Sequence, residues 1–341
     1  MDFELGIDTF GDVTRDASGQ LLPHDQVIRN VVTQGIRADE VGLNFIGLGE
    51  HHREDFAVSA PDLVLAGIAT RTERIRLGSA VTVLSSDDPV RVYERFATLD
   101  ALSNGRAEVI LGRGSFIESF PLFGYSLGDY EALFEEKLEL FARLRTDQPI
   151  TWQGTHTQSL DRVTLYPSMP RPLPTWVAVG GSPESVLRAA RHGLPLMLAI
   201  IGGPAQRFAP FADLYRQAMA EAGHPAPRVG YHSPGHIAET DEQARAEFYE
   251  AWQAQTARIG AERGWRPPTR ASFRQEVESG ALIVGSPETA ARKIAAGLTA
   301  LGANRVDIKV ATGTLPHDQI MASIHLLGTE VRPLVTDMLA P

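Results

Sequence analysis

Short apolar runs rich in β-branched residues alternate with longer stretches of helical pattern through most of the 341 residues. This alternation requires parallel strands joined by crossover helices, which defines the α/β class. The predicted strands cover residues 3–7, 44–48, 75–84, 107–111, 175–179, 196–201, 228–237 and 305–310. The predicted helices cover residues 25–41, 61–72, 89–102, 130–145, 183–192, 205–222, 241–259 and 317–327.

Eight strand–helix units are the number that closes a barrel with a filled interior, so we predict a (β/α)8 TIM barrel. A doubly wound open sheet is the competing arrangement. Insertions are expected near 148–174, as a hairpin or loop, and near 260–301. The second holds a mobile excursion over 260–282 and an extra helix over 287–301. No low-complexity linker divides the chain, so residues 1–341 are predicted to form one domain.

The charge balance argues against one class of partner. The formal charge is −10, with 32 Lys+Arg against 42 Asp+Glu, whereas a nucleic-acid binder needs a basic face. The chain has no cysteine, which excludes disulfides, thiolate nucleophiles and iron–sulfur clusters. The most apolar run, residues 193–204, is far shorter than the ~20 residues that cross a bilayer. With no signal-peptide pattern at the N-terminus, we expect a cytoplasmic protein that does not bind membranes.

Several motifs of common enzyme classes are missing from the sequence. It has no G-x-S-x-G elbow, no P-loop and no H-E-x-x-H. Two glycine pairs, at 47–49 and 112–114, lack the third glycine of the dinucleotide-binding motif. A Rossmann enzyme that uses NAD therefore has little support.

Glu50-His51-His52 stands at the carboxyl end of the second predicted strand. In a TIM barrel this end faces the active site. A carboxylate and two imidazoles there could donate protons or hold an oxyanion. Adjacent histidines at the end of a strand point in different directions, so we predict no metal site. The alternative is a polar loop in which one histidine caps the next element.

Two further motifs suggest a phosphate site. Arg113 lies between two glycines after the fourth strand, where a ligand can approach the bare backbone and the guanidinium can bind phosphate. Residues 179–185 read Val-Gly-Gly-Ser-Pro-Glu-Ser, which is a strand end, a glycine pair and a capped helix start. The alternative for Arg113 is a surface salt bridge, and the alternative for residues 179–185 is helix capping without ligand binding.

The capping pattern recurs at residues 285–289, Gly-Ser-Pro-Glu-Thr. Only the first copy follows directly on an apolar strand and carries a second glycine. We therefore assign phosphate binding to the first copy alone. Together, the motifs predict a phosphate-bearing cofactor whose planar ring lies over the strand ends near the paired histidines.

These motifs belong to a longer pattern. It includes Glu50-His51-His52, the segments 75–84, 88–91 and 99–106, Gly112-Arg113-Gly114, and the segments 180–185, 192–195 and 285–288. In order and spacing, the pattern resembles the bacterial luciferase-like family of flavin-dependent monooxygenases. The resemblance covers nearly the whole chain, from the first strand to the final helix.

The resemblance implies a luciferase-like (β/α)8 barrel that uses reduced FMN, supplied by a separate flavin reductase, to activate O2. A C4a-(hydro)peroxide of the flavin would then oxidise a small organic substrate. A sister branch shares the barrel and uses deazaflavin for hydride transfer, which is the main alternative. A non-catalytic flavin-binding protein is the alternative from another class. Relatives commonly form homodimers, and a monomeric sedimentation coefficient at micromolar concentration would refute that expectation here.

The resemblance also assigns residues. It implies chemistry at His51, with Glu50 and His52 beside it, and a non-proline cis peptide between Ala80 and Val81. The luciferase α chain has a reactive cysteine where this chain has Gly112, so light emission is not expected. The positions that would hold the cofactor are Ala80, Val81, Gly112, Arg113, Val179, Gly180, Gly181, Ser182 and Ser185.

Overall fold

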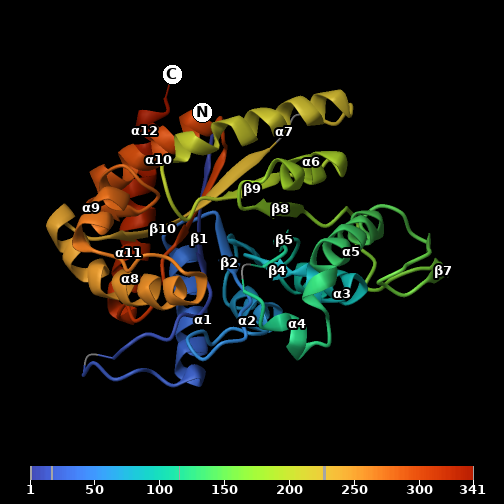
Figure 1. The fold of residues 1–341 in the computed structure, drawn as a ribbon, viewed down its shortest axis with the longest axis horizontal. Helices are drawn as coiled ribbons and strands as arrows, with labels where there is room; N and C mark the ends of the chain where they lie inside the picture. Colours follow the sequence, from blue (N-terminus) through green and yellow to red (C-terminus); the bar gives the residue numbers. More distant parts are fainter. Residues whose placement is uncertain (1, 17, 115, 226–227, 341) are drawn as a thin grey trace.

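Eight parallel strands close into a barrel in the computed structural model, which describes residues 2–16, 18–114, 116–225 and 228–340 (Figure 1). Each strand pairs with the next, and the last pairs with the first, so the sheet is closed. The predicted (β/α)8 barrel is therefore confirmed, and the open sheet is excluded. In order around the barrel the strands are β1 (Glu4–Thr9), β2 (Phe45–Leu48), β3 (Arg76–Ser79), β5 (Ala107–Gly112), β8 (Thr175–Val179), β9 (Leu196–Ala199), β10 (Val229–Ile237) and β12 (Arg305–Lys309).

Helices surround the barrel and cover the outward side chains of its strands, such as Leu5 and Ile7 of β1. None of the described helices is long and apolar enough to cross a membrane. Local signals set the ends of several helices; Asp88, for example, accepts hydrogen bonds from two backbone amides in the first turn of α3. The main helices are α1 (His24–Glu40), α2 (Pro61–Ala69), α3 (Pro89–Leu102), α5 (Tyr130–Leu144), α6 (Pro183–Arg191), α7 (Ala209–Glu221), α8 (Asp241–Arg263), α10 (Pro287–Leu301) and α11 (His317–Leu326).

The third predicted strand is not continuous. It is divided into β3 and β4 (Thr82–Val83), and between them the peptide bond from Ala80 to Val81 is cis, as the resemblance implied. Glycines of the neighbouring strands make room for this segment. A Cβ atom added at Gly47 would lie 2.6 Å from the Cβ of Ala80, and one added at Gly112 would lie 2.7 Å from a Val81 methyl group.

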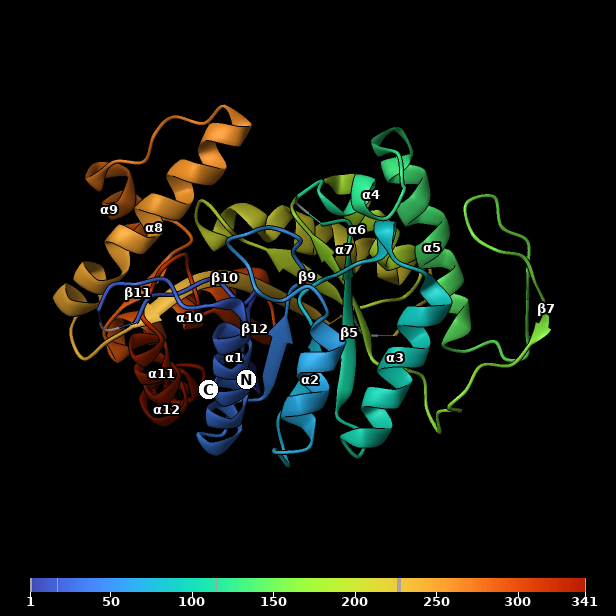
Figure 2. The ribbon, with the colours of Figure 1, turned by 90° about the horizontal axis from the view of Figure 1, so that it is seen from below.

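The first insertion was predicted to be a hairpin or a loop, and it is a hairpin. Strands β6 (Ile150–Trp152) and β7 (Leu160–Val163) pair antiparallel beside α5. Figure 2 shows this hairpin projecting at the edge of the molecule. The prediction of a single domain stays a prediction.

Residues 260–282, which were expected to form a mobile excursion without regular structure, are largely helical. Helix α8 continues to Arg263, and α9 (Arg270–Glu278) follows, begun by a capping box between Thr269 and Ser272. Gly260, where the predicted helix ended, lies inside α8 close to Trp265. Also unpredicted were the short strand β11 (Ile283–Gly285) and the helices α4 (Ser119–Leu122) and α12 (Arg332–Met338).

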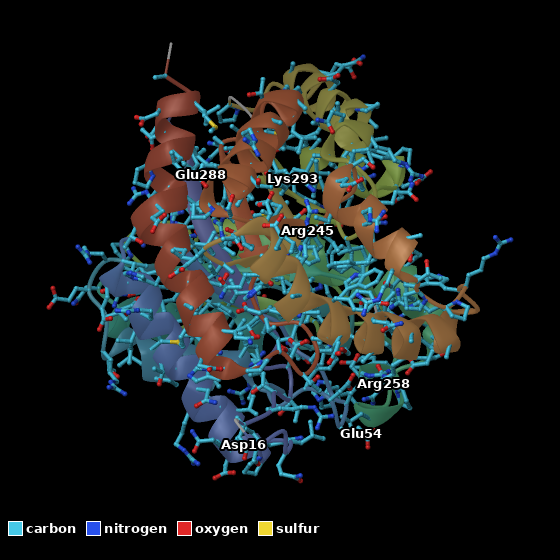
Figure 3. All side chains as sticks on the ribbon, turned by 90° about the vertical axis from the view of Figure 1, so that its left-hand side faces the viewer. Asp16, Glu54, Arg245, Arg258, Glu288 and Lys293 are labelled. Atoms are coloured by element: carbon cyan, nitrogen blue, oxygen red, sulfur yellow. The ribbon has the colours of Figure 1, made fainter. Side chains whose placement is uncertain are left out.

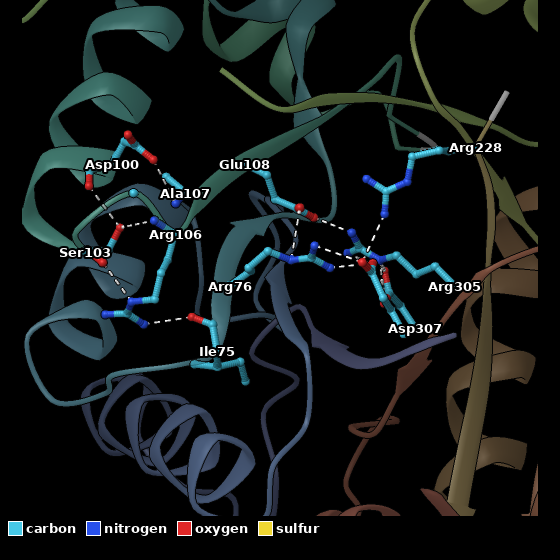
Figure 4. Close-up of polar contacts among 12 residues, drawn as sticks. Ile75, Arg76, Asp100, Ser103, Arg106, Ala107, Glu108, Arg228, Arg305 and Asp307 are labelled. Carbon is cyan, nitrogen blue, oxygen red and sulfur yellow. Dashed lines mark hydrogen bonds and ion pairs between the residues drawn. The ribbon is translucent and has the colours of Figure 1, made fainter. Parts of the chain in front are cut away.

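Charged side chains fill the amino-terminal end of the barrel interior (Figure 4). Arg305 is fully buried and donates to Asp307 at 2.9–3.1 Å and to Glu108. Its guanidinium also lies 3.8 Å from the centre of the Phe45 ring. Burial raises the pKa of Asp307 to about 6 in spite of Arg305. Arg305, together with Arg76 at 3.6 Å from Glu108, thus supplies the positive charge for two buried carboxylates.

We predict that Arg305→Met lowers the free energy of unfolding by about 3–5 kcal/mol, because it leaves Asp307 buried without a cation and Glu108 with Arg76 alone. Urea unfolding at neutral pH measures the loss. Arg228→Met is the control: the Arg228 side chain is 41% exposed and pairs with Glu4 at 3.0 Å, so its loss should cost less than about 1 kcal/mol. Equal losses in the two variants would contradict this account of the cluster.

Candidate functional site

The candidate residues from different parts of the sequence lie at one end of the barrel. Glu50, His51 and His52 follow β2, Arg113 follows β5, and the glycine pair at 180–181 follows β8. Because all barrel strands run parallel, their carboxyl ends meet at the same mouth. Figure 2 shows α4 and the α8–α9 pair at this side of the strands, with α1, α2 and α3 extending away from it.

Three of the predicted phosphate residues form one hydrogen-bonded group at the start of α6. The Arg113 guanidinium donates to Ser185 Oγ at 3.2 Å. The hydroxyls of Ser182 and Ser185 are 2.9 Å apart, and Ser182 Oγ also accepts from the Ser185 amide. Arg113 in addition pairs with Glu131, whose side chain is 60% exposed. A cation, two hydroxyls and a helix N-terminus therefore converge, which is a combination suited to a phosphate group.

The backbone beside this group is open. A Cβ atom added at Gly180 would meet no atom within 4 Å. Gly181 has φ of +103°, a conformation that residues with a side chain rarely adopt. The glycine pair thus gives both the turn and the bare surface that a ligand needs to approach closely.

The second copy of the capping pattern has a different environment. Ser286 caps α10 as Ser182 caps α6, but its amide donates to the Asp241 carboxylate at 2.7 Å. Asp241 also accepts from the Thr289 hydroxyl at 3.1 Å. A carboxylate of the protein itself therefore occupies the start of α10, whereas an arginine stands at the start of α6. This difference favours the first copy as the anion site.

The residues expected near the cofactor ring are placed unequally. Val81 lies against Gly112 and packs on the interior cluster of Phe45, Ile110, Trp176 and Met197, and the Ala80 side chain lies against Gly47. The side chain of Val179 instead lies in the core between the barrel and its helices. Only the backbone of Val179 can therefore face the mouth.

His51 is enclosed by three phenylalanines. Its ring centre lies 4.7 Å from that of Phe10, 4.5 Å from Phe56 and 4.9 Å from Phe116. Its Nε2 atom is buried and has no hydrogen-bond partner within the described part of the chain. Burial, with a smaller contribution from the nearby cations Lys309 and Arg53, lowers the pKa of His51 to about 3. At neutral pH this imidazole is uncharged.

Glu50 and His52 pair with each other. The Nε2 atom of His52 lies 2.8 Å from the Glu50 carboxylate, and the two side chains are nearly buried. Phe123 approaches the His52 ring edge-on at 5.1 Å. This pair holds the loop after β2 in shape beside His51.

Ion pairs join that loop to the insertion that follows β10. Arg53 binds both carboxylate oxygens of Glu262 on α8, at 2.6 and 3.0 Å, and also Glu118. Arg258 of α8 pairs with Glu54 at 3.1 Å, and Figure 3 shows these two side chains close together. The carboxyl-terminal half of α8 is thereby fixed over the loop that carries His51.

Four charged or titratable residues inside the barrel were not predicted from the sequence. Asp8, Asp12 and Lys309 lie at or near the carboxyl ends of β1 and β12, and His232 lies within β10 at the level of Ala199, the last residue of β9. They form the pairs His232–Asp8 and Lys309–Asp12. The signal was present, because two aspartates follow the first predicted strand as Glu50 follows the second. It was overlooked because no motif of a known enzyme class includes them.

Residues 4–305 match the sequence pattern of the luciferase-like monooxygenases. The uncharacterised protein y4wF of Sinorhizobium fredii is 28% identical over 305 residues, which are 86% of this chain and 87% of the relative. The 4-hydroxyprotoasukamycin monooxygenase of Streptomyces nodosus subsp. asukaensis is 29% identical over 265 residues, 73% of this chain and 71% of the relative. An F420-dependent glucose-6-phosphate dehydrogenase of Amycolatopsis mediterranei is 28% identical over 174 residues, 48% of this chain and 51% of the relative.

Solved structures share the fold along almost their whole length. Monooxygenase RslO1 from Streptomyces bottropensis has a TM-score of 0.82 at 24% identity, with 97% of this chain and 99% of that chain aligned. The 3,6-diketocamphane monooxygenase of Pseudomonas putida, in complex with FMN, has a TM-score of 0.77 at 18% identity, with 98% of this chain and 99% of that chain aligned. An F420-dependent secondary alcohol dehydrogenase has 0.75 at 17%, with the same coverage.

We predict that His51 contributes to acid destabilisation. Its pKa is about 3 in the fold against 6.5 for an ordinary histidine, so below pH 6.5 the unfolded chain binds a proton that the folded chain does not. The free energy of unfolding of the wild type should therefore fall as the pH drops from 6.5 towards 3, and His51→Gln should reduce this fall. Urea unfolding at several pH values measures it. His52→Gln is the control, and an unchanged pH dependence in His51→Gln would contradict the prediction.

Proposed function

The chain belongs to the luciferase-like monooxygenase family, and the characterised proteins similar to it are monooxygenases and related oxidoreductases. We therefore propose that it oxidises a small organic substrate with O2 and reduced FMN. The observation that carries the cofactor assignment is the group of Arg113, Ser182 and Ser185 at the start of α6. When bound, reduced FMN supplies the two electrons that activate O2.

The residues at the mouth fit FMN. Its terminal phosphate is a compact dianion, and the guanidinium, two hydroxyls and helix start offer charge-assisted hydrogen bonds of the kind it needs. The open backbone at Gly180 leaves room for the ribityl chain to pass from this group towards the barrel axis. The flavin ring would then lie against Val81 and Gly112.

His51 has a defined task in this proposal. It is a neutral imidazole whose buried Nε2 has no partner among the described residues, so one hydrogen bond is left for a bound ligand. The Glu50–His52 pair keeps the loop in the conformation that presents it. The phenylalanines around His51 keep water away, which strengthens any hydrogen bond made there.

A deazaflavin-dependent hydride transfer is the second candidate, favoured by the F420-dependent relative and the F420-dependent structure on the same barrel. Three expectations stay predictions from the sequence: a flavin reductase as transient partner, a homodimer and a cytoplasmic location. The exposed leucine Leu63 on α2 is compatible with the predicted dimer contact.

The proposed function predicts micromolar binding of FMN and oxygenation of an organic substrate. Fluorescence titration with FMN and with F420 tests the first part. For the second, the protein with reduced FMN is mixed with ¹⁸O2 and a panel of organic compounds, and mass spectrometry detects one labelled oxygen atom in the product. Binding of F420 alone would instead support hydride transfer. Binding of FMN with no substrate-stimulated consumption of O2 would support the non-catalytic alternative.

For the phosphate site, we predict that Arg113→Ala weakens FMN binding by about 1.5–3 kcal/mol, because a charge-assisted hydrogen bond is lost. The same fluorescence titration measures the change. Ser286→Ala, in the second copy of the capping pattern, is the matched control. It should leave FMN affinity unchanged and cost about 1 kcal/mol of stability. Equal effects on FMN affinity would show that the wrong copy was chosen.

A further inference from the structure

The proposed reaction consumes a proton that His51 does not hold. Monoanionic reduced FMN, O2, the substrate and one proton give oxidised FMN, the oxygenated substrate and water. Without substrate, the same flavin, O2 and one proton give oxidised FMN and hydrogen peroxide. The pKa of His51 is about 3, so its imidazole carries no spare proton at neutral pH. A group at the mouth that is protonated near neutral pH would deliver this proton faster than water does.

In one of the two interior pairs, Lys309–Asp12, no N–H group of the ammonium is left without a hydrogen-bond partner. The ammonium group of Lys309 donates to both oxygens of Asp12 at 3.0 Å and to the carbonyl of Ala311. Asp12 also accepts from the side chain of Gln255 at 2.8 Å and from the amide of Gly313 at 2.9 Å. These bonds tie β1 and β12 to α8, and they make the pair a structural element.

The other pair, His232–Asp8, is open. His232 Nδ1 lies 2.6 Å from Asp8 Oδ2, and no described residue makes a hydrogen bond with His232 Nε2. The second carboxylate oxygen of Asp8, which is only 1% exposed, likewise has no partner among the described residues. The His232 side chain is 14% exposed, so it is not completely sealed from solvent. This pair combines buried charge with unused hydrogen-bonding atoms.

The strands direct this pair towards the barrel axis. Ile7 and Tyr231, the residues just before Asp8 and His232, pack outward in the core under the helices. Since side chains alternate along a strand, Asp8 and His232 point inward. β9 pairs with β10 and places Ala199 level with His232, and Gly180 follows directly on β8, the next strand of the barrel. The β9 residue level with His232 thus has only a methyl side chain, and no atom lies within 4 Å of a Cβ position at Gly180.

We propose that His232, held by Asp8, is the proton donor of the barrel mouth. The proposal rests on the proposed function and adds a residue to it. In the step, the Nε2–H bond of the imidazolium breaks and an O–H bond forms on an oxygen anion derived from O2. His232 becomes neutral, Asp8 keeps its charge, and water returns the proton to the imidazole. Asp8 is a positioning residue, because its bond to Nδ1 fixes the ring and aims Nε2.

The charges around His232 favour this role. Burial lowers the pKa of His232, but the Asp8 carboxylate more than offsets this and raises it above the ordinary value. Lys309 of β12 opposes the rise and Asp307 of the same strand supports it. The imidazolium is therefore the form present below this raised pKa, and it is lost as the pH increases through it.

The test uses the full-length protein, reduced FMN and O2 without organic substrate. Stopped-flow absorbance follows the formation of oxidised FMN at pH values on both sides of neutrality. In the wild type, the rate should fall as the pH rises through the pKa of His232. His232→Gln should lower the rate below that pKa by about 10²-fold or more and remove the pH dependence. Asp8→Asn should keep the rate at low pH and move its fall to lower pH.

Two readouts separate this role from a structural one. FMN affinity should be the same in the wild type, His232→Gln and Asp8→Asn. In the protein without flavin, the NMR signals of the His232 ring should titrate above the range of an ordinary histidine in the wild type, and at lower pH in Asp8→Asn.

The chain also offers a matched control. His236, on the same strand, pairs with Glu247 at the same 2.6 Å but is fully buried and stacked on Phe248 of α8. His236→Gln should leave the rate and its pH dependence unchanged. A wild-type rate in His232→Gln, or an equal loss in His236→Gln, would overturn the proposal. A wild type that binds no FMN would refute the proposed function, and the inference with it.

Discussion

The ladder of hydrogen bonds between β12 and β1 determines what this chain can build. It pairs the last strand with the first, from Glu4 opposite Arg305 to Asp8 opposite Lys309, and so closes the sheet. Closure leaves no edge strand within the barrel, and it forces residues from the two ends of the chain to share one interior. Asp12 and Lys309 become partners only because of it, as do the carboxylate of Glu108 and the guanidinium of Arg305.

The two ends of this interior use buried charge differently. At the amino-terminal end, Arg305 and Arg76 balance the charges of Asp307 and Glu108, and the Arg305 guanidinium lies over the Phe45 ring. At the carboxyl-terminal end, unused atoms remain on His51 and on Asp8. Stability is concentrated at the first end and chemical capacity at the second, which is the division of a barrel enzyme.

The sequence predicted the barrel well because strand and helix periods, capping residues and glycines are local signals. Arg113 and Ser182 were also found locally, each beside glycines at a strand end. The Lys309–Asp12 and His232–Asp8 pairs could not be predicted in the same way, because their partners lie more than 200 residues apart. Glu50 and His52 illustrate a different limit: their types were informative, but only the coordinates show that they pair with each other and not with His51. The extent of α8 was misjudged because Gly260 reads as a helix end unless its contact with Trp265 is known.

Glu131 gives the anion site a property that its list of donors does not suggest. Its carboxylate bridges Arg113 and Arg188, so before any ligand arrives the guanidinium of Arg113 already has a counter-ion. A ligand at the proposed anion site would compete with that carboxylate for the guanidinium. A monovalent anion such as chloride or acetate would gain little from such an exchange, because it would replace a tethered charge of equal size. A phosphate monoester carries nearly twice the charge, so we expect the resident carboxylate to favour ligands of high charge density.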